Sequence, residues 1–231
     1  MDFSKKYTNR DILIIGGGTS TLDVKWEKLI KPETFIWTCN DFYLNDRVTA
    51  YDIDLFQLAY TTDLHNEKLI EYLKRVRPFT YFEYNHYRQK WNDPVFKQFE
   101  KKVGYGIPGM NIDIGQVEYS EGQKSGAVLR LIMLALATNA KNIYFVGFDG
   151  FDKNFSNVHA FTGHKGLKKS DTRRDWTTGY YDVFMQAYLL LAEYDSQRRL
   201  QNLGEGFNYN IATEVSQKYF TLRKEVYEAI R

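Results

Sequence analysis

The stretch Asp11–Asp23 combines residue types that bind phosphates or nucleotides. It reads DILIIGGGTSTLD: a short aliphatic run, three consecutive glycines and then small hydroxyl side chains. In a glycine turn between a strand and a helix, backbone amides converge where the helix dipole also favours anions. The turn nearly fits G-x-G-x-x-G, but Thr21 replaces the third glycine, and no Gly-Lys-Ser/Thr follows for a P-loop. We predict a nucleotide cradle, with a dinucleotide site and a plain tight turn as alternatives, formed by Gly16, Gly17, Gly18, Thr19 and Ser20.

Two other segments place polar residues where a ligand could reach them. Asn40 ends an expected strand, and the carboxyl ends of strands are where open α/β sheets bind ligands. Its amide can donate to and accept from a ribose or a base edge. Ser125 is a good helix N-cap, and the following glycine would let a ligand approach the first amides of the helix. We predict ligand contacts, with purely structural caps as the alternative, at Asn40, Lys124, Ser125 and Gly126.

The segment that follows the most clearly defined strand contains residues suited to proton transfer. Asp149 lies in GFDGFD and could orient a hydroxyl group or act as a base. Residues 149–177 show no periodicity and are rich in Lys, Arg and His. A long irregular segment in a compact domain is commonly a functional lid, and positive charge suits a phosphate-bearing ligand. A solvated loop is the alternative. We predict catalytic roles for Asp149, His159 and His164, and phosphate contacts for Lys165 and Arg173.

The sequence Asp52-Ile53-Asp54 raises the question of a metal. Asp-x-Asp can hold a divalent cation that bridges a nucleotide diphosphate. Here the two aspartates fall in an alternating stretch, residues 51–56, where exposed carboxylates on one strand face are ordinary. We therefore predict no metal ligand, and a divalent cation is allowed but not favoured.

The composition restricts the class of protein. The 231 residues have a formal net charge of +2, which neither requires nor excludes a nucleic-acid partner. Cys39 is the only cysteine, so there is no disulfide framework. No apolar run reaches the roughly 18 residues of a membrane span, and the N-terminus lacks a signal-peptide core. We expect a cytoplasmic protein. Aromatic residues make up 16% and predict an aromatic core or a stacking surface for sugars or bases.

Hydrophobic periodicity predicts elements that would position these residues. Strands are expected at Ile12–Ile15, Phe35–Thr38, Ala50–Phe56, Thr80–Tyr84, Asn142–Val146 and Tyr209–Ala212. Helices are expected at Leu22–Ile30, His65–Val76, Asp93–Val103, Ser125–Ala137, Thr178–Leu203 and Val215–Ile230. Alternation of strands and helices predicts α/β architecture. We expect a single Rossmann-like domain over residues 1–231, with a mostly parallel sheet, helices on both faces and the lid at 149–177.

Together these segments resemble the small bacterial sialyltransferases of glycosyltransferase family 42. The resemblance rests on ILIIGGGTSTLD, TCNDFYLND, KSGAVLRLIMLALATNAKNIYFVGFDGF and NYNIATEVS, and on a lid that precedes a long helix. It implies a Rossmann-like domain with a lid and metal-independent transfer from a nucleotide-activated sugar. By position, the glycine turn, Asn40 and Ser125-Gly126 would hold the nucleotide.

The chain also departs from that family's pattern. Gly17 stands where the family has Asn, and Phe151 stands where it has a phosphate-binding Tyr, with His159 near the second such position. The segment Thr177-Thr178-Gly179 contains no His, although the family's catalytic His precedes the long helix. The resemblance therefore assigns neither the sugar nor the base.

A glycosyltransferase is the leading hypothesis, with a CMP- or UDP-sugar donor and no required cofactor. The acceptor would be a glycan or a hydroxymethylated base in viral DNA, and such a base would have to be extruded from the duplex. The host compartment would be a bacterial cytoplasm or that of a virus-infected cell, and an oligomer is left open. The alternatives are a phosphotransferase resembling pterin diphosphokinases, a nicotinamide oxidoreductase and a non-catalytic nucleotide-binding module.

Overall fold

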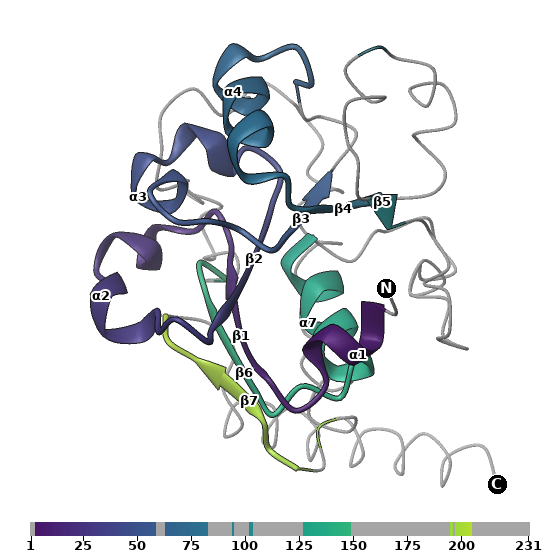
Figure 1. The fold of residues 1–231 in the computed structure, drawn as a ribbon. Helices are drawn as coiled ribbons and strands as arrows, with labels where there is room; N and C mark the ends of the chain where they lie inside the picture. Colours follow the sequence, from purple (N-terminus) through teal and green to yellow (C-terminus); the bar gives the residue numbers. More distant parts are fainter. Residues whose placement is uncertain are drawn as a thin grey trace, which may run out of the picture.

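A sheet of seven parallel strands forms the centre of the described chain, in the order β5-β4-β3-β2-β1-β6-β7 (Figure 1). The computed structural model describes residues 3–58, 63–82, 94, 102–103, 127–148, 195 and 197–204. The strands are β1 Asp11–Ile15, β2 Phe35–Cys39, β3 Leu55–Leu58, β4 Phe79–Phe82, β5 Lys102–Val103, β6 Asn142–Val146 and β7 Leu200–Asn202. The predicted Rossmann-like α/β fold is confirmed.

Helices cover both faces of the sheet, as predicted. One face packs against α1 (Phe3–Tyr7) and α7 (Ala127–Ala137). The other packs against α2 (Trp26–Leu29), α3 (Asp46–Thr49) and α4 (Glu67–Val76). Short 3₁₀ turns, η1 (Thr19–Leu22) and η2 (Phe42–Leu44), follow β1 and β2. A parallel strand covered on both faces is apolar without alternation, which explains the run from residue 12 to 15.

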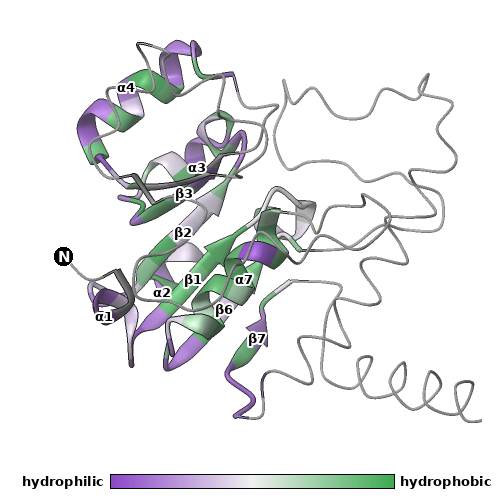
Figure 2. Ribbon diagram, turned by 90° about the vertical axis from the view of Figure 1, so that its right-hand side faces the viewer, coloured by the Kyte–Doolittle hydropathy of each residue, from purple (hydrophilic) through white to green (hydrophobic). Residues whose placement is uncertain are grey.

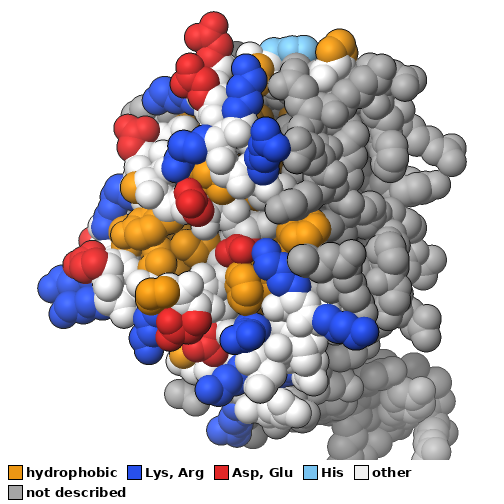
Figure 3. Space-filling model, in the orientation of Figure 1, with side chains coloured by type: hydrophobic (Ala, Val, Ile, Leu, Met, Phe, Trp, Pro, Cys, Tyr) orange, Lys and Arg blue, Asp and Glu red, His pale blue; other side chains and the backbone are white. Residues whose placement is uncertain are grey.

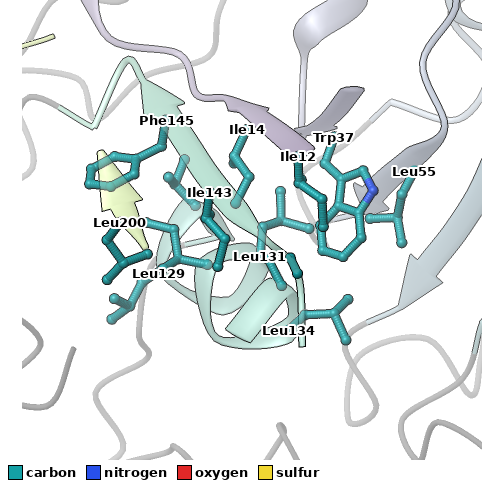
Figure 4. Packing of buried hydrophobic residues seen from close by; sticks show 14 of the residues in the cluster. Ile12, Ile14, Trp37, Leu55, Leu129, Leu131, Leu134, Ile143, Phe145 and Leu200 are labelled. Carbon is teal, nitrogen blue, oxygen red and sulfur yellow. The ribbon is translucent and has the colours of Figure 1, made fainter. Parts of the chain in front are cut away.

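The α7 face holds the largest cluster of buried side chains. Ile12 and Ile14 of β1 point into it, together with Trp37 of β2 and Phe145 of β6. Figure 4 shows these side chains gathered against leucines of α7. Each such side chain contributes about 1.5–3 kcal/mol by leaving water. The packing fixes β1, β2 and β6 relative to one another, and these strands lead into the loops discussed below.

Several predicted boundaries were right and others were wrong. The helices that became α4 and α7 and the strand that became β6 were predicted within two residues. Of the helix expected at Leu22–Ile30, only Trp26–Leu29 forms, as α2, and Leu22 is the last residue of η1. The carbonyl oxygens of Leu22 and Val24 accept from Arg47 instead of from helical amides, so tertiary contacts override a short helical periodicity. The strand expected at Ala50–Phe56 begins only at Leu55, since α3 occupies residues 46–49 under an Asn45 cap that accepts from Arg47 N at 3.1 Å.

Two segments that were expected to be the last residues of helices form strands instead. Lys102–Val103, expected to close a helix, pairs with β4 as β5. Leu200–Asn202, expected within a long helix, pairs with β6 as β7. The buried carboxylate of Asp195 accepts from Leu200 N at 2.8 Å and from Arg199 Nε at 3.2 Å, which ties the start of β7 in place. The strand and helix expected at 209–212 and 215–230 lie outside the described residues.

The sequence also predicted the absence of a membrane span and of a metal ligand. Among the described helices, none has the length and hydropathy needed to cross a bilayer. Within the same residues, no group of three His, Cys, Asp or Glu side chains is placed to hold a metal. Asp52 pairs with Arg75 at 3.1 Å, whereas Asp54 pairs with Lys6 at 3.0 Å and accepts from Ile36 N. The two carboxylates therefore serve separate partners.

The two aspartates provide a matched test of these roles. Replacing Asp54 with Ala removes the acceptor of Ile36 N and the partner of the part-buried Lys6, so we expect a loss of about 1–3 kcal/mol in stability. Replacing exposed Asp52 with Ala should cost less than about 1 kcal/mol. Urea unfolding would measure both, and equal losses would contradict this assignment. EDTA should leave the wild-type midpoint unchanged.

Candidate ligand-binding edge of the sheet

The candidate site lies at the carboxyl edge of the sheet. From β1 the chain proceeds to β2, β3, β4 and β5 on one side, and β6 and β7 lie on the other. The loops after β1 and β6 therefore diverge at a topological switch point, where open α/β sheets bind ligands. The predicted glycine turn follows β1, Asn40 follows β2, and Gly147 follows β6.

At this switch point the backbones after β1 and β6 touch. A Cβ atom on Gly16 would collide with the carbonyl oxygen of Gly147 and would lie 2.8 Å from Val128 Cγ2. Gly147 has φ of +72°, and a Cβ there would lie 2.8 Å from the carbonyl carbon of Gly16 and from Thr21 Cγ2. Both positions therefore require glycine for close approach, and Gly147 requires it for its backbone conformation as well.

Hydrogen bonds also join the segments that follow β1 and β6. Gly16 N donates to the carbonyl oxygen of Val146 at 2.8 Å, and Gly18 N donates to that of Gly147 at 3.1 Å. Gly147 N donates to Ser20 Oγ at 3.0 Å. Thus two amides of the predicted cradle already donate within the protein. Whether Gly16, Gly17, Gly18, Thr19 and Ser20 contact a ligand stays a prediction.

Next to this contact, two amide side chains lie near the ends of β2 and β3: Asn40 directly after β2, and Gln57 within β3. Asn40 adopts a left-handed conformation with φ of +53°, and its N–H donates to the carbonyl oxygen of Gln57 at 2.9 Å. Among the described residues, neither Asn40 Oδ1 nor Gln57 Oε1 has a hydrogen-bond partner, although both atoms are buried. Gln57 is only 1% exposed. A buried carbonyl oxygen without a donor costs about 1–3 kcal/mol, so this pair is suited to receiving donors from a ligand.

Sequence reasoning identified Asn40 and missed Gln57. The sequence signal for Gln57 was a single amide within the apolar run LFQLA. In a strand buried on both faces, a polar side chain normally needs a hydrogen-bond partner. Register places Gln57 beside Cys39 of β2, which belongs to the α7-side cluster. The amide therefore lies on the α7 face of the sheet.

Two buried side chains close to Asn40 in sequence, a thiol and a phenol, hold their protons tightly. Burial, together with the nearby Asp41 carboxylate, raises the pKa of the Cys39 thiol to about 12. Tyr43 Oη donates to Asp41 Oδ1 at 3.3 Å, and burial followed by the Asp41 charge raises the pKa of Tyr43 above its ordinary value. Both groups remain protonated at neutral pH. Neither Cys39 nor Tyr43 is therefore suited to act as a base there.

A shallow hollow of about 400 Å³ lies between α3 and α4, with a lining that includes Tyr43 and Tyr72. Both of its basic groups already have partners: Lys68 lies 3.8 Å from Asp46, and Arg75 pairs with Asp52. Lysines, arginines and carboxylates are intermingled on the face shown in Figure 3. We assign no ligand to this hollow.

The other predicted site residues lie outside the described part of the chain: Lys124, Ser125, Gly126, Asp149, His159, His164, Lys165 and Arg173. The described residues that border them in sequence are Ala127, where α7 begins, and Phe148, which follows Gly147. α7 also contains a feature that the sequence did not predict. Arg130 is only 2% exposed, and Figure 2 shows a hydrophilic patch on this otherwise hydrophobic helix.

The fold defines the chain as a Rossmann-like α/β protein, and solved structures with a similar fold are sialyltransferases. Family models and curated proteins show no match. The structure is similar to the α-2,3-sialyltransferase Cst-I of Campylobacter jejuni, at 16% identity, over 85% of this chain and 76% of that one, with a TM-score of 0.59.

It is also similar to the sialyltransferase CstII of Campylobacter jejuni in complex with the substrate analogue CMP-3FNeuAc. That likeness has 15% identity over 84% of this chain and 82% of that one, with a TM-score of 0.56. CST-II with a trisaccharide acceptor and CMP matches at 13% identity over 84% and 81%, with a TM-score of 0.55. The resemblance seen in the sequence is thereby confirmed for the fold.

Replacing Gly147 with Ala should disrupt the contact between β1 and β6. The substitution adds backbone strain of about 1–3 kcal/mol and overpacking of similar size, because the new methyl would meet Gly16 and Thr21. We expect a lower free energy of unfolding in urea titrations. The exposed Gln201→Ala in β7 is the control and should stay within about 0.5 kcal/mol of wild type. A wild-type midpoint for Gly147→Ala would refute the close approach.

The buried thiol predicts how stability changes at alkaline pH. A thiol whose folded pKa lies near 12, against an ordinary 9.0, keeps its proton more strongly in the folded state. Its stabilisation is present below pH 9 and is lost as pH rises from 9 towards 12. Cys39→Ala should therefore show a shallower decline in unfolding free energy between pH 8.5 and 10.5 than wild type. Parallel declines would contradict a buried, neutral Cys39.

Proposed function

We propose that the protein is a glycosyltransferase that transfers a sugar from a nucleotide-activated donor, preferably a CMP-sugar, to a hydroxyl group of a glycan. Its fold is similar to that of sialyltransferases whose structures hold CMP, a CMP-sugar analogue or a trisaccharide acceptor. The observation that supports a donor at this edge is the pair of buried amide oxygens of Asn40 and Gln57.

These amides suit a nucleoside. Ribose hydroxyls and the exocyclic amine of cytosine are hydrogen-bond donors, and an amide side chain can also donate to a base carbonyl. Asn40 and the glycine turn follow neighbouring strands, since Ile15 of β1 lies beside Thr38 of β2. We propose that the nucleoside lies over the ends of β2 and β3, and that Gly16–Ser20 border it.

Transfer also needs a base for the acceptor hydroxyl and charge to stabilise the departing phosphate. We propose Asp149, His159 and His164 for proton transfer, and Lys165 and Arg173 for the phosphate. Lys124, Ser125 and Gly126, immediately before α7, would add backbone and side-chain donors. The donor is a substrate, and the proposed reaction assigns no role to a metal.

A glycan is the preferred acceptor. One structural neighbour holds a trisaccharide, and positive and negative side chains are mixed on the described part of the face shown in Figure 3. A DNA base would require steep salt dependence of acceptor binding. The phosphotransferase alternative would need a divalent metal, and the two aspartates that could bind one, Asp52 and Asp54, pair instead with Arg75 and Lys6.

A nucleotide panel tests the donor proposal. CMP should raise the melting temperature more than UDP, GDP or ADP, with or without Mn²⁺, because a ligand that binds only the folded state stabilises it. Asn40→Ala and Gln57→Ala should each weaken CMP binding about five- to hundredfold, as expected when a buried hydrogen bond is lost. The exposed Gln201→Ala should bind as wild type. Unchanged CMP affinity in both site variants would refute the site.

Turnover then separates an enzyme from a non-catalytic binding module. With a CMP-sugar and a glycan acceptor, release of CMP should depend on Asp149, His159 or His164. At least one alanine variant should lose about 100-fold or more in kcat while still binding CMP. Full activity in all three would place the base elsewhere, and CMP binding without any turnover in wild type would favour the binding module.

A further inference from the structure

Arg47 connects the loops that follow β1 and β2. It lies in the first turn of α3, and its exposed side chain extends to the segment after η1. Arg47 Nη1 donates to the carbonyl oxygens of Thr21, at 3.2 Å, and Leu22. Nη2 donates to the carbonyl oxygen of Val24 at 2.6 Å. The carbonyls at the C-terminal end of a helical turn lack partners within the turn, so one guanidinium satisfies those of Thr21 and Leu22, and it also satisfies the carbonyl of Val24 just beyond η1.

The guanidinium also lies over an aromatic ring. Its Cζ lies 5.8 Å from the ring centre of Trp26, which is only 3% exposed. A planar group can stack on an aromatic ring and donate from its edge simultaneously. The compact ammonium of lysine cannot direct hydrogen bonds to three separate carbonyls in this way. The arrangement therefore depends on arginine rather than on positive charge.

The segment that Arg47 holds is the one that joins the ends of β1 and β6. Ser20 accepts from Gly147 N, and Thr21 Oγ1 donates to the carbonyl oxygen of Gly18 at 2.7 Å. Thr21 Cγ2 lies against Gly147. Arg47 itself lies on the segment that leads from Asn40 through η2 into α3. It thus links both sides of the candidate site through the protein backbone.

We propose that Arg47 is a positioning residue, which sets the glycine turn relative to Asn40 and Gln57 and thereby determines donor affinity. The inference rests on the proposed function for its ligand. No donor contact by Arg47 itself is required. If Arg47 only stabilised the fold, replacing it would lower the melting temperature without selectively weakening donor binding.

Arg75 supplies a matched control. It too is an exposed arginine that donates to a backbone carbonyl, that of Thr49, at 3.0 Å, and its Cζ lies 5.1 Å from the ring centre of Tyr72. It joins α4 to α3, and its hydrogen bonds within the described part of the chain go to Thr49 and Asp52 and not to residues 16–24. Arg75→Ala therefore removes a similar carbonyl and aromatic contact at another place, together with the exposed ion pair to Asp52.

The experiment compares wild type, Arg47→Ala, Arg47→Lys and Arg75→Ala by calorimetric titration with CMP and by amide hydrogen exchange. Arg47→Ala should weaken CMP binding at least about tenfold, since small displacements of positioned groups cost large factors. Arg75→Ala should change it less than about twofold. Arg47→Lys should bind more tightly than Arg47→Ala but less tightly than wild type. Exchange of the Gly18, Thr21 and Asp23 amides should accelerate in Arg47→Ala and not in Arg75→Ala.

The outcomes separate the two proposals. If wild type binds CMP and Arg47→Ala binds it equally well, the positioning role is wrong and the proposed function stands. Equal losses in Arg47→Ala and Arg75→Ala would also overturn it, because the effect would then be general destabilisation. If wild type binds none of the nucleotides, the donor proposal fails. If hydrogen exchange of the three amides is unchanged in Arg47→Ala, Arg47 does not position the glycine turn, and this result requires no ligand.

Discussion

The close approach of Gly16 and Gly147 is the constraint on which the carboxyl edge of the sheet depends. Parallel strands normally diverge into their loops, but here the two loops are joined immediately beyond β1 and β6. Only glycine, which has no Cβ, permits this distance at both positions, and the positive φ of Gly147 is a second reason for glycine there. The contact fixes where η1 begins and therefore where Ser20 and Thr21 lie.

Closing the β1–β6 side has a consequence for where a ligand can be recognised. The amides of Gly16 and Gly18 donate to backbone carbonyls, whereas the amide oxygens of Asn40 and Gln57 have no partner among the described residues. A folded chain tolerates few buried polar atoms without partners, because each costs free energy. These two oxygens lie towards β2 and β3, and in the proposed site the glycine turn would contribute mainly by its shape.

The sequence predicted the parts of the fold that local pattern determines. Apolar runs gave β1, β2 and β6, and long amphipathic or apolar periodicity gave α4 and α7. It failed where tertiary contacts decide: Leu200–Asn202 forms a strand because β6 offers a free edge and Asp195 holds its first amide. It failed again at Leu22–Ile30, where a single helical pattern is divided between two short turns.

The candidate site was predictable to a similar extent and for the same reason. Asn40 was accessible to sequence reasoning because a polar residue directly after an apolar strand marks the carboxyl edge of a sheet. Gln57 and Arg47 were not, since one lies inside a strand and the other on a short exposed helix. The roles proposed for them arise from contacts in the folded chain. The amide oxygen of Gln57 is buried without a partner among the described residues, and Arg47 donates to three carbonyls about 25 residues away in sequence. A site assembled from loops on separate strands is thus marked in sequence by its glycines and caps, while the residues that hold those loops together become recognisable only in the folded chain.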